Sequence, residues 1–345
     1  MRRSRTALLV LLASLAVALV AAGCGGGDDE SSGGSTATSG SSAKAAPIKL
    51  AFSTWNGYIG LVIGVKEGFF EKAGVDVEYT VVEDPVQRFN AFKAGSLNAI
   101  ATTVDTFSRT NANGVASVMV LGLDASVGGD GIVAKKDITS VEQLKGQTVA
   151  VSQGSTSQWL LAYVLDQHGL SLNDVKQTDL TSGDAGAAFV AGSVPVAVTW
   201  EPWLSKAEEN PDGHVLASTK EYPDIITDEV AFSPDFVKEN PDSITAFLKG
   251  YAMAVDFLKS NPDDAIADVT DYLGQSPEDV KATMETVPIW SIEDSKKFFG
   301  TADSPGPINE IFTKSAEFWK ELGETDTVPD PSEAIDPSFL QDFSG

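Results

Sequence analysis

The sequence predicts an α/β protein built as two lobes, and three observations predict it. Short apolar runs alternate with helical patterns over residues 48–123, an order typical of a parallel sheet flanked by helices. The same alternation restarts after a polar, glycine-rich break at residues 124–131. About 300 residues follow residue 46, which is more than one hydrophobic core normally supports.

The first run of elements opens with an apolar segment that begins at Ile48. Asp84 and Pro85 form a helix start, with a capping carboxylate followed by proline at the first helical position. We expect strands at residues 48–54, 75–82, 99–102 and 117–123. We expect helices at residues 58–68, from Pro85 onward and at residues 106–113.

The second run repeats this rhythm, and the chain then becomes helical. Strands are expected at residues 132–134, 148–151, 175–180 and 196–200. Helices are expected at residues 141–144, 156–168 and 185–191. From about Tyr222 helices dominate to the end, and between Ile244 and Leu258 apolar residues recur at helical spacing, so this segment packs one face on a core.

The N-terminal segment is typical of an exported protein. Three arginines precede an apolar run at residues 7–20, which is shorter than the roughly 20 residues that a membrane-spanning helix needs. The run ends in small residues directly before Cys24, which resembles the lipobox of bacterial lipoproteins except that Ala21 stands where Leu or Val is usual. We therefore expect a signal peptide at residues 1–23, a lipid on Cys24 and an extracytoplasmic, membrane-anchored protein. The alternative is an ordinary signal peptide with an incidental cysteine.

Residues 24–46 are predicted to be a flexible tether, because glycine, serine, threonine, alanine and aspartate without apolar periodicity cannot bury a core. The whole chain carries a net charge of −25, and without the three arginines of the signal peptide the charge is −28. Such a surface repels nucleic acid and anionic lipid headgroups, and it serves solubility. We expect no nucleic-acid partner.

Residue types that support catalysis or metal binding are scarce. Cys24 is the only cysteine, which excludes a disulfide within the chain and a cysteine-based metal site. His168 and His214 are the only histidines, and neither has the spacing of a metal-ligand pair. Because the sequence also lacks a Walker loop, a nucleophile elbow and a zinc-binding His-Glu pattern, we expect no catalytic residues, no metal and no cofactor.

Six segments in a fixed order resemble the nitrate, taurine and alkanesulfonate binding-protein family, which also includes binders of thiamine-pyrimidine precursors. They are WNGY at 55–58, KEGFFEKAGVDV at 66–77, AGSLNA at 94–99, GDGIVA at 129–134, LKGQTVA at 144–150 and WEPW at 200–203. The resemblance extends from about residue 48 to at least residue 235.

The resemblance implies a type II periplasmic-binding fold whose two lobes close around a small solute. Each lobe is then a mainly parallel sheet flanked by helices, with a helical C-terminal part. The expected divisions are a first lobe at 47–128, a second lobe at 129–221 and a return to the first lobe at 222–345. The implied partners are the solute and the permease and ATPase of an ABC importer, and the protein is expected to act as a monomer.

Ligands of such folds lie beyond the carboxyl ends of the parallel strands, which points to four residues of the first lobe. Trp55 and Tyr58 follow the first strand and either wall the pocket or pack the local turn. Thr103 and Asp105 follow a later strand, and Asp105 alternatively caps the helix that begins near Thr106.

Four further candidates lie at the crossing between lobes and just after it. Asp124 and Asp130 flank the crossing, where a closing cleft brings polar groups together; the alternative is hydrogen bonding to the backbone of the glycine-rich turn. Ser155 and Thr156 open a helix, whose free N–H groups and hydroxyls suit a polar ligand, although capping alone explains them equally.

Trp200 and Glu201 end a strand and complete the candidate site. Opposite Trp55 and Tyr58 they make a cation clamp of ring faces and a carboxylate, whereas the alternative role of Glu201 is to favour a helix dipole. The predicted cleft is rich in acids, and Arg88 and Arg109 are not clearly placed to face it. A small amine, guanidinium compound or aminopyrimidine therefore suits the cleft better than nitrate or a sulfonate.

Two other function classes remain open. One is an enzyme similar to thiamine-pyrimidine synthase, which is disfavoured because that activity is associated with a cysteine-rich iron site. The other is a surface sensor that uses the same fold without transport.

Overall fold

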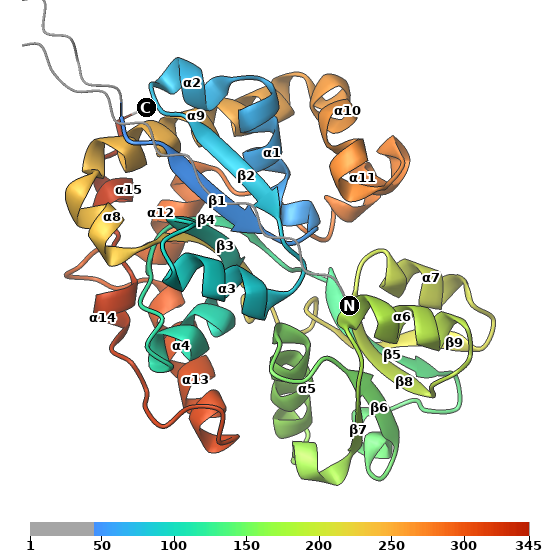
Figure 1. Ribbon diagram of the computed structural model, residues 1–345. Coiled ribbons are helices and arrows are strands. Elements are labelled where there is room, and N and C mark those ends of the chain that lie inside the picture. Colours follow the sequence, from blue (N-terminus) through green and yellow to red (C-terminus); the bar gives the residue numbers. More distant parts are fainter. Residues whose placement is uncertain (1–44, 345) are drawn as a thin grey trace, which may run out of the picture. The chain divides into compact units, whose positions relative to one another are not determined.

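The computed structural model describes residues 45–344, and Figure 1 labels their helices and strands. The predicted signal peptide, the lipidation site at Cys24 and nearly all of the predicted tether lie outside the described residues. Within residues 45–344 no helix has both the length and the apolar composition that a membrane crossing requires.

The first sheet contains five strands in the order β2-β1-β3-β10-β4. β1 (Ile48–Phe52) pairs in parallel with β2 (Val77–Val81) and with β3 (Ala99–Thr103). β10 (Thr227–Phe232) inserts between β3 and β4 (Val118–Ala125) and runs antiparallel to both. The chain thus returns to its first sheet after building the second.

The second sheet has the same plan, with the order β7-β6-β8-β5-β9. β6 (Thr148–Val151) pairs in parallel with β7 (Lys176–Asp179) and with β8 (Val196–Trp200). β5 (Asp130–Lys135) lies between β8 and β9 (Gly213–Ser218) and is antiparallel to both.

Helices cover both sheets, and their bounds follow the capping and proline signals of the sequence. Those of the first region are η1 (Asn56–Tyr58), α1 (Ile59–Lys66), α2 (Phe69–Ala73), α3 (Pro85–Lys93) and α4 (Val104–Ala112). Those of the second are η2 (Val141–Leu144), α5 (Thr156–Gln167), η3 (Leu172–Asp174), α6 (Ser182–Val190) and α7 (Trp203–Glu209).

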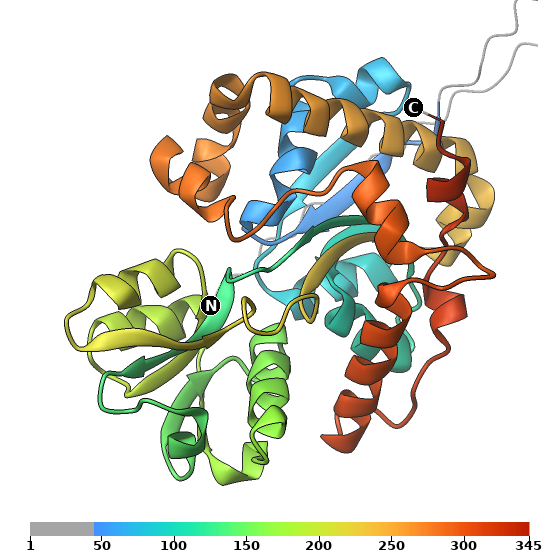
Figure 2. The same cartoon turned by 180° about the vertical axis from the view of Figure 1, so that it is seen from behind.

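The C-terminal part is helical beyond β10. It comprises α8 (Pro234–Glu239), α9 (Pro241–Ser260), α10 (Pro262–Leu273), α11 (Pro277–Thr283), α12 (Ile292–Phe299), α13 (Pro307–Glu321), α14 (Pro331–Ala334) and α15 (Ser338–Asp342). The apolar face of α9 between Ile244 and Leu258 is buried, as its spacing predicts. Figure 2 shows α9 in orange along the first sheet, and α1 and α2 pack against it.

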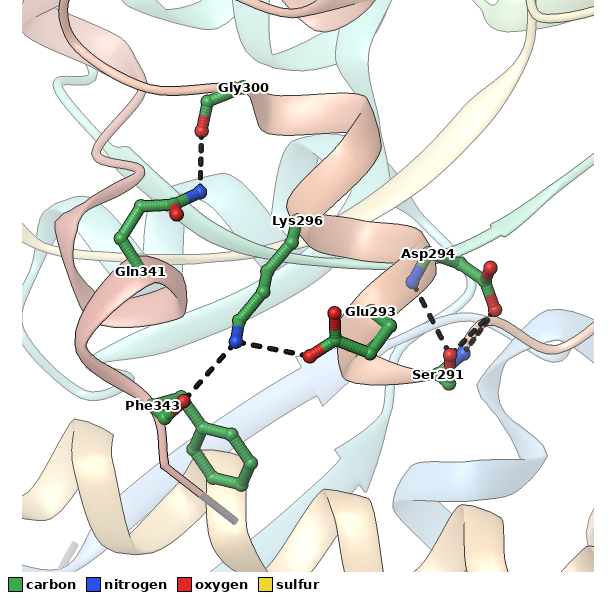
Figure 3. Close-up of polar contacts among 7 residues, drawn as sticks. All are labelled: Ser291, Glu293, Asp294, Lys296, Gly300, Gln341 and Phe343. Carbon is green, nitrogen blue, oxygen red and sulfur yellow. Dashed lines mark hydrogen bonds and ion pairs between the residues drawn. The ribbon is translucent and has the colours of Figure 1, made fainter.

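The last residues of the described chain are fixed to α12. Lys296 Nζ donates to the carbonyl of Phe343 at 3.2 Å and pairs with Glu293 Oε1 at 3.1 Å (Figure 3). Gln341 donates its amide to the carbonyl of Gly300 at 2.8 Å. These contacts hold α15 beside α12.

The two-lobed α/β architecture is confirmed, with three differences from the expected elements. Each sheet, although mainly parallel as expected, contains one antiparallel strand, because β10 and β5 run opposite to both of their neighbours. β9 and β10 were not predicted; every residue of β10 is buried, so the strand lacks the alternation of exposed and buried residues that reveals a strand. α6 begins at Ser182 instead of at residue 185, because the hydroxyl of Thr181 caps it.

Candidate functional site

Two aspartates lie side by side in the first sheet. Asp124 of β4 and Asp228 of β10 are paired residues of neighbouring strands, so their side chains lie on the same face. Both are buried. Tyr58, at the end of η1, donates its hydroxyl to Asp228 Oδ1, which gives Asp228 a close hydrogen-bond partner.

Trp55 fixes the position of Asp124. Its backbone N–H donates to the hydroxyl of Tyr272 at 2.9 Å, and its indole N–H donates to Asp124 Oδ1 at 3.4 Å. Gly57 leaves room for this carboxylate, because a Cβ at that position would lie 1.9 Å from Asp124 Oδ2. The segment WNGY therefore wraps around the carboxylate.

The second sheet contributes Asp130 and Trp200. They are paired residues of β5 and β8, so their side chains lie on the same face of that sheet. The rings of Trp200 and Trp55 meet edge to face with their centroids 6.5 Å apart. The two tryptophans thus bring the first and second sheets together beside Asp124 and Asp130.

A second contact between the lobes involves Asp105 and Thr156. Thr156 Oγ1, in the first turn of α5, donates to Asp105 Oδ1 at 3.1 Å and lies 2.8 Å from Thr103 Oγ1. The Asp105 carboxylate is buried at the start of α4, and its backbone carbonyl accepts the indole N–H of Trp319 at 2.9 Å. Asp105 therefore joins α4 of the first lobe to α5 of the second.

We call Asp105, Asp124, Asp130 and Asp228 the carboxylate cluster. Burial raises the pKa of Asp105 to about 6 and those of Asp130 and Asp228 to about 7. Burial also raises the pKa of Asp124 well above its usual value, and the charge of Asp228 adds to this effect. The cause in each case is the loss of water, which disfavours the charged form of a carboxyl group.

Two members of the cluster retain an oxygen without a partner. Asp124 Oδ2 and Asp130 Oδ2 are buried and accept no hydrogen bond from the described residues. Both carboxylate oxygens of Glu229 in β10 are also buried and accept no hydrogen bond from the residues that the structure describes. Because neighbouring residues of a strand point to opposite faces, Glu229 lies on the face of the first sheet opposite Asp228.

Two arginines act on the other members of the cluster. Burial raises the pKa values of Asp228 and Asp105. The positive charge of Arg88 partly offsets this rise at Asp228, and that of Arg109 partly offsets it at Asp105. Arg88 is buried and donates to the carbonyl of Val82 at 2.8 Å. Both arginines thus act on carboxylates of the cluster, although the sequence does not place either of them clearly toward the cleft.

Charges of the same sign surround Asp124 and Asp130. The charged groups that act on Asp124 are Asp228 and Asp130, and both raise its pKa. The charged groups that act on Asp130 are Asp105 and Glu201, and both also raise its pKa. A positive group placed between these two carboxylates would meet attraction from each of them.

Most of the predicted ligand residues come together in this structure. Those that meet around the carboxylate cluster are Trp55, Tyr58, Thr103, Asp105, Asp124, Asp130, Thr156 and Trp200. Their contact with a solute stays a prediction. The alternative that Asp105 caps a helix is wrong, because α4 begins at Val104 and Asp105 lies in its first turn.

Ser155 and Glu201 perform the local roles considered as alternatives, and their contact with a solute also stays a prediction. Ser155 accepts from the backbone N–H of Ser157 at 3.2 Å and caps α5. Glu201 accepts from the backbone N–H of Ser205 at 3.1 Å and from its hydroxyl at 2.9 Å, so each carboxylate oxygen accepts one hydrogen bond. Asp130, the cross-strand partner of Trp200, adds a second carboxyl group beside that ring.

Asp228, Glu229 and Arg88 were not among the predicted site residues. The two acids could have been found from their position directly before the apolar run Val230 to Phe232. Burying a carboxylate in such a run is costly, so acids at this position indicate a functional role. For Arg88, on α3, no sequence signal indicates that the guanidinium turns inward. Among residues 45–344 no group of three or more histidine, cysteine, aspartate or glutamate residues is arranged to hold a metal ion.

A surface hollow of about 290 Å³ lies elsewhere, between α9, α12 and the C-terminal segment. Lys249, Asp256 and Glu293 are among its lining residues. The unpartnered buried oxygens of Asp124 and Asp130 lie outside it. We therefore take the carboxylate cluster as the candidate site, since buried carboxyl oxygens without a hydrogen-bond partner are costly and a ligand can supply that partner.

Known proteins share both the sequence pattern and the fold. A family model described as "NMT1/THI5 like" matches residues 55–265. A protein of Escherichia coli K12 named "Putative aliphatic sulfonates-binding protein" is 30% identical over 48% of this chain and 53% of its own length. The "Taurine-binding periplasmic protein" of the same strain is 27% identical over 61% of this chain and 67% of its own length. The first of these alignments spans only about half of the relative.

Solved structures agree with the two-lobed architecture. The aliphatic sulphonate binding protein SsuA of Escherichia coli has a TM-score of 0.70 at 22% identity, over 84% of this chain and 92% of its own. The alkanesulfonate-binding protein SsuA of Xanthomonas axonopodis pv. citri, bound to MOPS, has a TM-score of 0.69 at 18% identity, over 86% and 99%. A Candida albicans protein described as having the generic periplasmic binding protein fold has a TM-score of 0.64 at 19% identity, over 84% and 96%. The predicted periplasmic-binding fold is thereby confirmed, and the sulfonate and taurine relatives carry the names of binding proteins, in agreement with the expectation of no catalysis.

Proposed function

Because the chain belongs to the NMT1/THI5-like family, we propose that it is the extracytoplasmic solute-binding component of an ABC importer. It captures a small nitrogen- or sulfur-containing organic solute between its lobes and delivers it to a permease and its ATPase. The names of the relatives support this role, and so does a fold whose two sheets each contribute side chains to one site. The site performs no chemistry on the solute.

The unpartnered oxygens of Asp124 and Asp130 favour a positively charged or amine-bearing solute, such as a guanidinium compound or an aminopyrimidine. Burying a carboxylate without a partner is costly, and a cation that brings charge and N–H donors removes this cost. A sulfonate or nitrate at the same place would add negative charge to a site that already holds buried carboxylates. Trp55 and Trp200 add ring faces that attract a cation.

Comparison of cations with anions tests the solute class. A thermal-shift screen of the ligand-free protein at pH 8 uses n-butylamine, a guanidine, an aminopyrimidine, taurine, an alkanesulfonate and nitrate, followed by calorimetry of each hit. A ligand that binds only the folded state raises the melting temperature, so we expect shifts from the amine-bearing compounds. Tight binding of alkanesulfonates without any response to amines would overturn the proposed solute class.

We propose that the protein is held at the outer face of the membrane by a lipid on Cys24, with the tether allowing the folded part to reach the permease. Small residues directly before this cysteine support the proposal. A Cys24→Ser variant should be released into the medium or periplasm in cell fractionation. Retention of that variant on membranes would contradict anchoring through Cys24.

Transport and sensing can be separated by reconstitution. With the permease and ATPase in proteoliposomes, solute-loaded protein should stimulate ATP hydrolysis. A surface sensor would bind the same solute and leave the ATPase unchanged.

A further inference from the structure

Trp55 and Asp124 form a first half-site on the first lobe. The indole N–H of Trp55 donates to Asp124 Oδ1 at 3.4 Å, which leaves Oδ2 buried and without a partner among the described residues. Trp55 and Asp124 are 8% and 0% exposed, respectively. The pair therefore offers one ring and one carboxylate oxygen that accepts no hydrogen bond from those residues and lies beside Gly57.

Trp200 and Asp130 form a matching half-site on the second lobe. They are direct partners across β8 and β5, so the ring and the carboxylate lie on one face of the second sheet. Asp130 is 5% exposed, and its Oδ2 is also without a partner among residues 45–344. Each lobe thus supplies one tryptophan and one aspartate with a free oxygen.

The two half-sites are adjacent. The ring centroids of Trp55 and Trp200 are 6.5 Å apart, and the Trp55 ring lies 3.4 Å from the position that a Cβ on Gly129 would occupy, next to Asp130. The charge of Asp130 also acts on Asp124. One small molecule can therefore contact both.

The remaining aspartates of the cluster have partners within the protein. Asp228 accepts the hydroxyl of Tyr58 and lies within the field of Arg88. Asp105 accepts from Thr156 and lies within the field of Arg109. Asp124 and Asp130 are the two carboxyl groups of the cluster on which no cationic side chain of the described chain acts, one in each half-site.

We propose that the solute carries two cationic nitrogen groups and that each half-site binds one of them, as an alkyl diamine would allow. This inference rests on the proposed capture of a solute between the lobes, and it narrows the solute from a cation to a dication. The ring of each half-site covers the nitrogen and its adjacent CH₂ group, while the free oxygen accepts its N–H. Bridging the half-sites would join the two lobes through the solute.

Calorimetry with matched amines tests the number of cationic groups. The probes are 1,3-diaminopropane, 1,4-diaminobutane and 1,5-diaminopentane, each compared with the n-alkylamine of equal chain length. We expect the best diamine to bind at least about 30-fold more tightly than its monoamine, since it pairs a second buried charge. Taurine and butanesulfonate serve as the anionic arm.

Single substitutions identify the half-sites. Asp124→Asn and Asp130→Asn should each reduce diamine affinity by about 30-fold or more and bring it close to that of the monoamine, whose own affinity changes little. The exposed Asp166→Asn on α5 is the matched control and should leave both affinities unchanged. Circular dichroism and the retained monoamine binding show that each variant is folded.

The outcomes separate this inference from the proposed function. Equal affinity for diamines and monoamines would overturn the dication and leave a cationic solute in place. Binding of sulfonates alone would overturn both. A diamine preference that survives in both aspartate variants would show that the second nitrogen binds elsewhere, which also overturns the assignment of the half-sites.

Discussion

Asp130→Asn should change the stability of the ligand-free protein in a way that depends on pH. Burial raises the pKa of Asp130 from its ordinary value of 3.8 to about 7 in the folded state. Between these two values the folded protein holds a proton that the unfolded chain releases, so wild-type stability falls as the pH rises through this range. Asparagine cannot ionise, and the variant lacks this part of the pH dependence.

The size of the effect follows from the two pKa values. Each pKa unit corresponds to about 1.4 kcal/mol, so ionised Asp130 lowers the free energy of unfolding by up to about 4 kcal/mol above pH 7. The asparagine amide in turn leaves an N–H group without an acceptor, at a cost of about 1–3 kcal/mol that is independent of pH. The variant should therefore be slightly less stable than wild type at pH 4 and more stable at pH 8, a total change of about 4 kcal/mol.

Urea denaturation of the ligand-free protein, repeated from pH 4 to pH 9, measures this difference. The exposed Asp166→Asn serves as control, and its difference from wild type should stay nearly constant over the same range. A difference for Asp130→Asn that is also constant with pH would refute the reasoning. An opposite sign, with the variant losing stability as the pH rises, would mean that a cation of the protein already pairs with Asp130.

Three further predictions concern the neighbouring contacts. Tyr58→Phe removes the hydroxyl that donates to buried Asp228. In urea denaturation this variant should have a free energy of unfolding that is lower by about 1–3 kcal/mol. No change would mean that Asp228 finds another hydrogen-bond donor. Thr156→Val removes the hydroxyl contacts with Asp105 and Thr103 that join α5 to α4. Solute affinity measured by calorimetry should therefore fall about tenfold. Unchanged affinity would contradict a role of Thr156 in closing the two lobes. The pKa values of Asp130 and Asp228 are about 7, so these carboxyl groups must lose their protons to pair with a cation. The affinity for cations should therefore rise from pH 5 to pH 8, and proton release should appear in calorimetry in buffers of different ionisation enthalpy. An affinity that falls as the pH rises would contradict this.

The sequence was sufficient for most of the fold because its regular elements are marked locally. The apolar run Val196 to Trp200 matches β8, and Asp84 with Pro85 marks the start of α3. β10 was missed because all its residues are buried and two of them are acidic, a combination that resembles neither an alternating strand nor an apolar one. Its insertion between β3 and β4 is also what makes the first sheet mixed.

The candidate site could be predicted only where residues follow a strand or flank the crossing between lobes. Asp124 and Asp130 met this condition. Asp228 did not, since its contact with Tyr58 spans 170 residues of sequence and depends on the return of the chain to the first sheet. Ser155 and Glu201 also met the condition, and both accept a backbone N–H near the start of a helix, a place that uses the same residue types whether or not a ligand binds there.

Under the proposed function, the stability of the empty protein and its affinity for solute depend on the same two carboxyl groups, Asp124 and Asp130. In the ligand-free state Asp124 and Asp130 have buried oxygens without partners, and burial opposes their ionisation. A solute that pairs with them removes this cost, so neutralising Asp130 should stabilise the empty protein at pH 8 and weaken the complex. A protein designed only for stability would carry asparagine or an apolar residue here. At a binding site, one substitution is therefore expected to raise the stability of the empty form and to lower that of the solute-loaded form. Removal of a purely structural carboxylate would lower the stability of both forms.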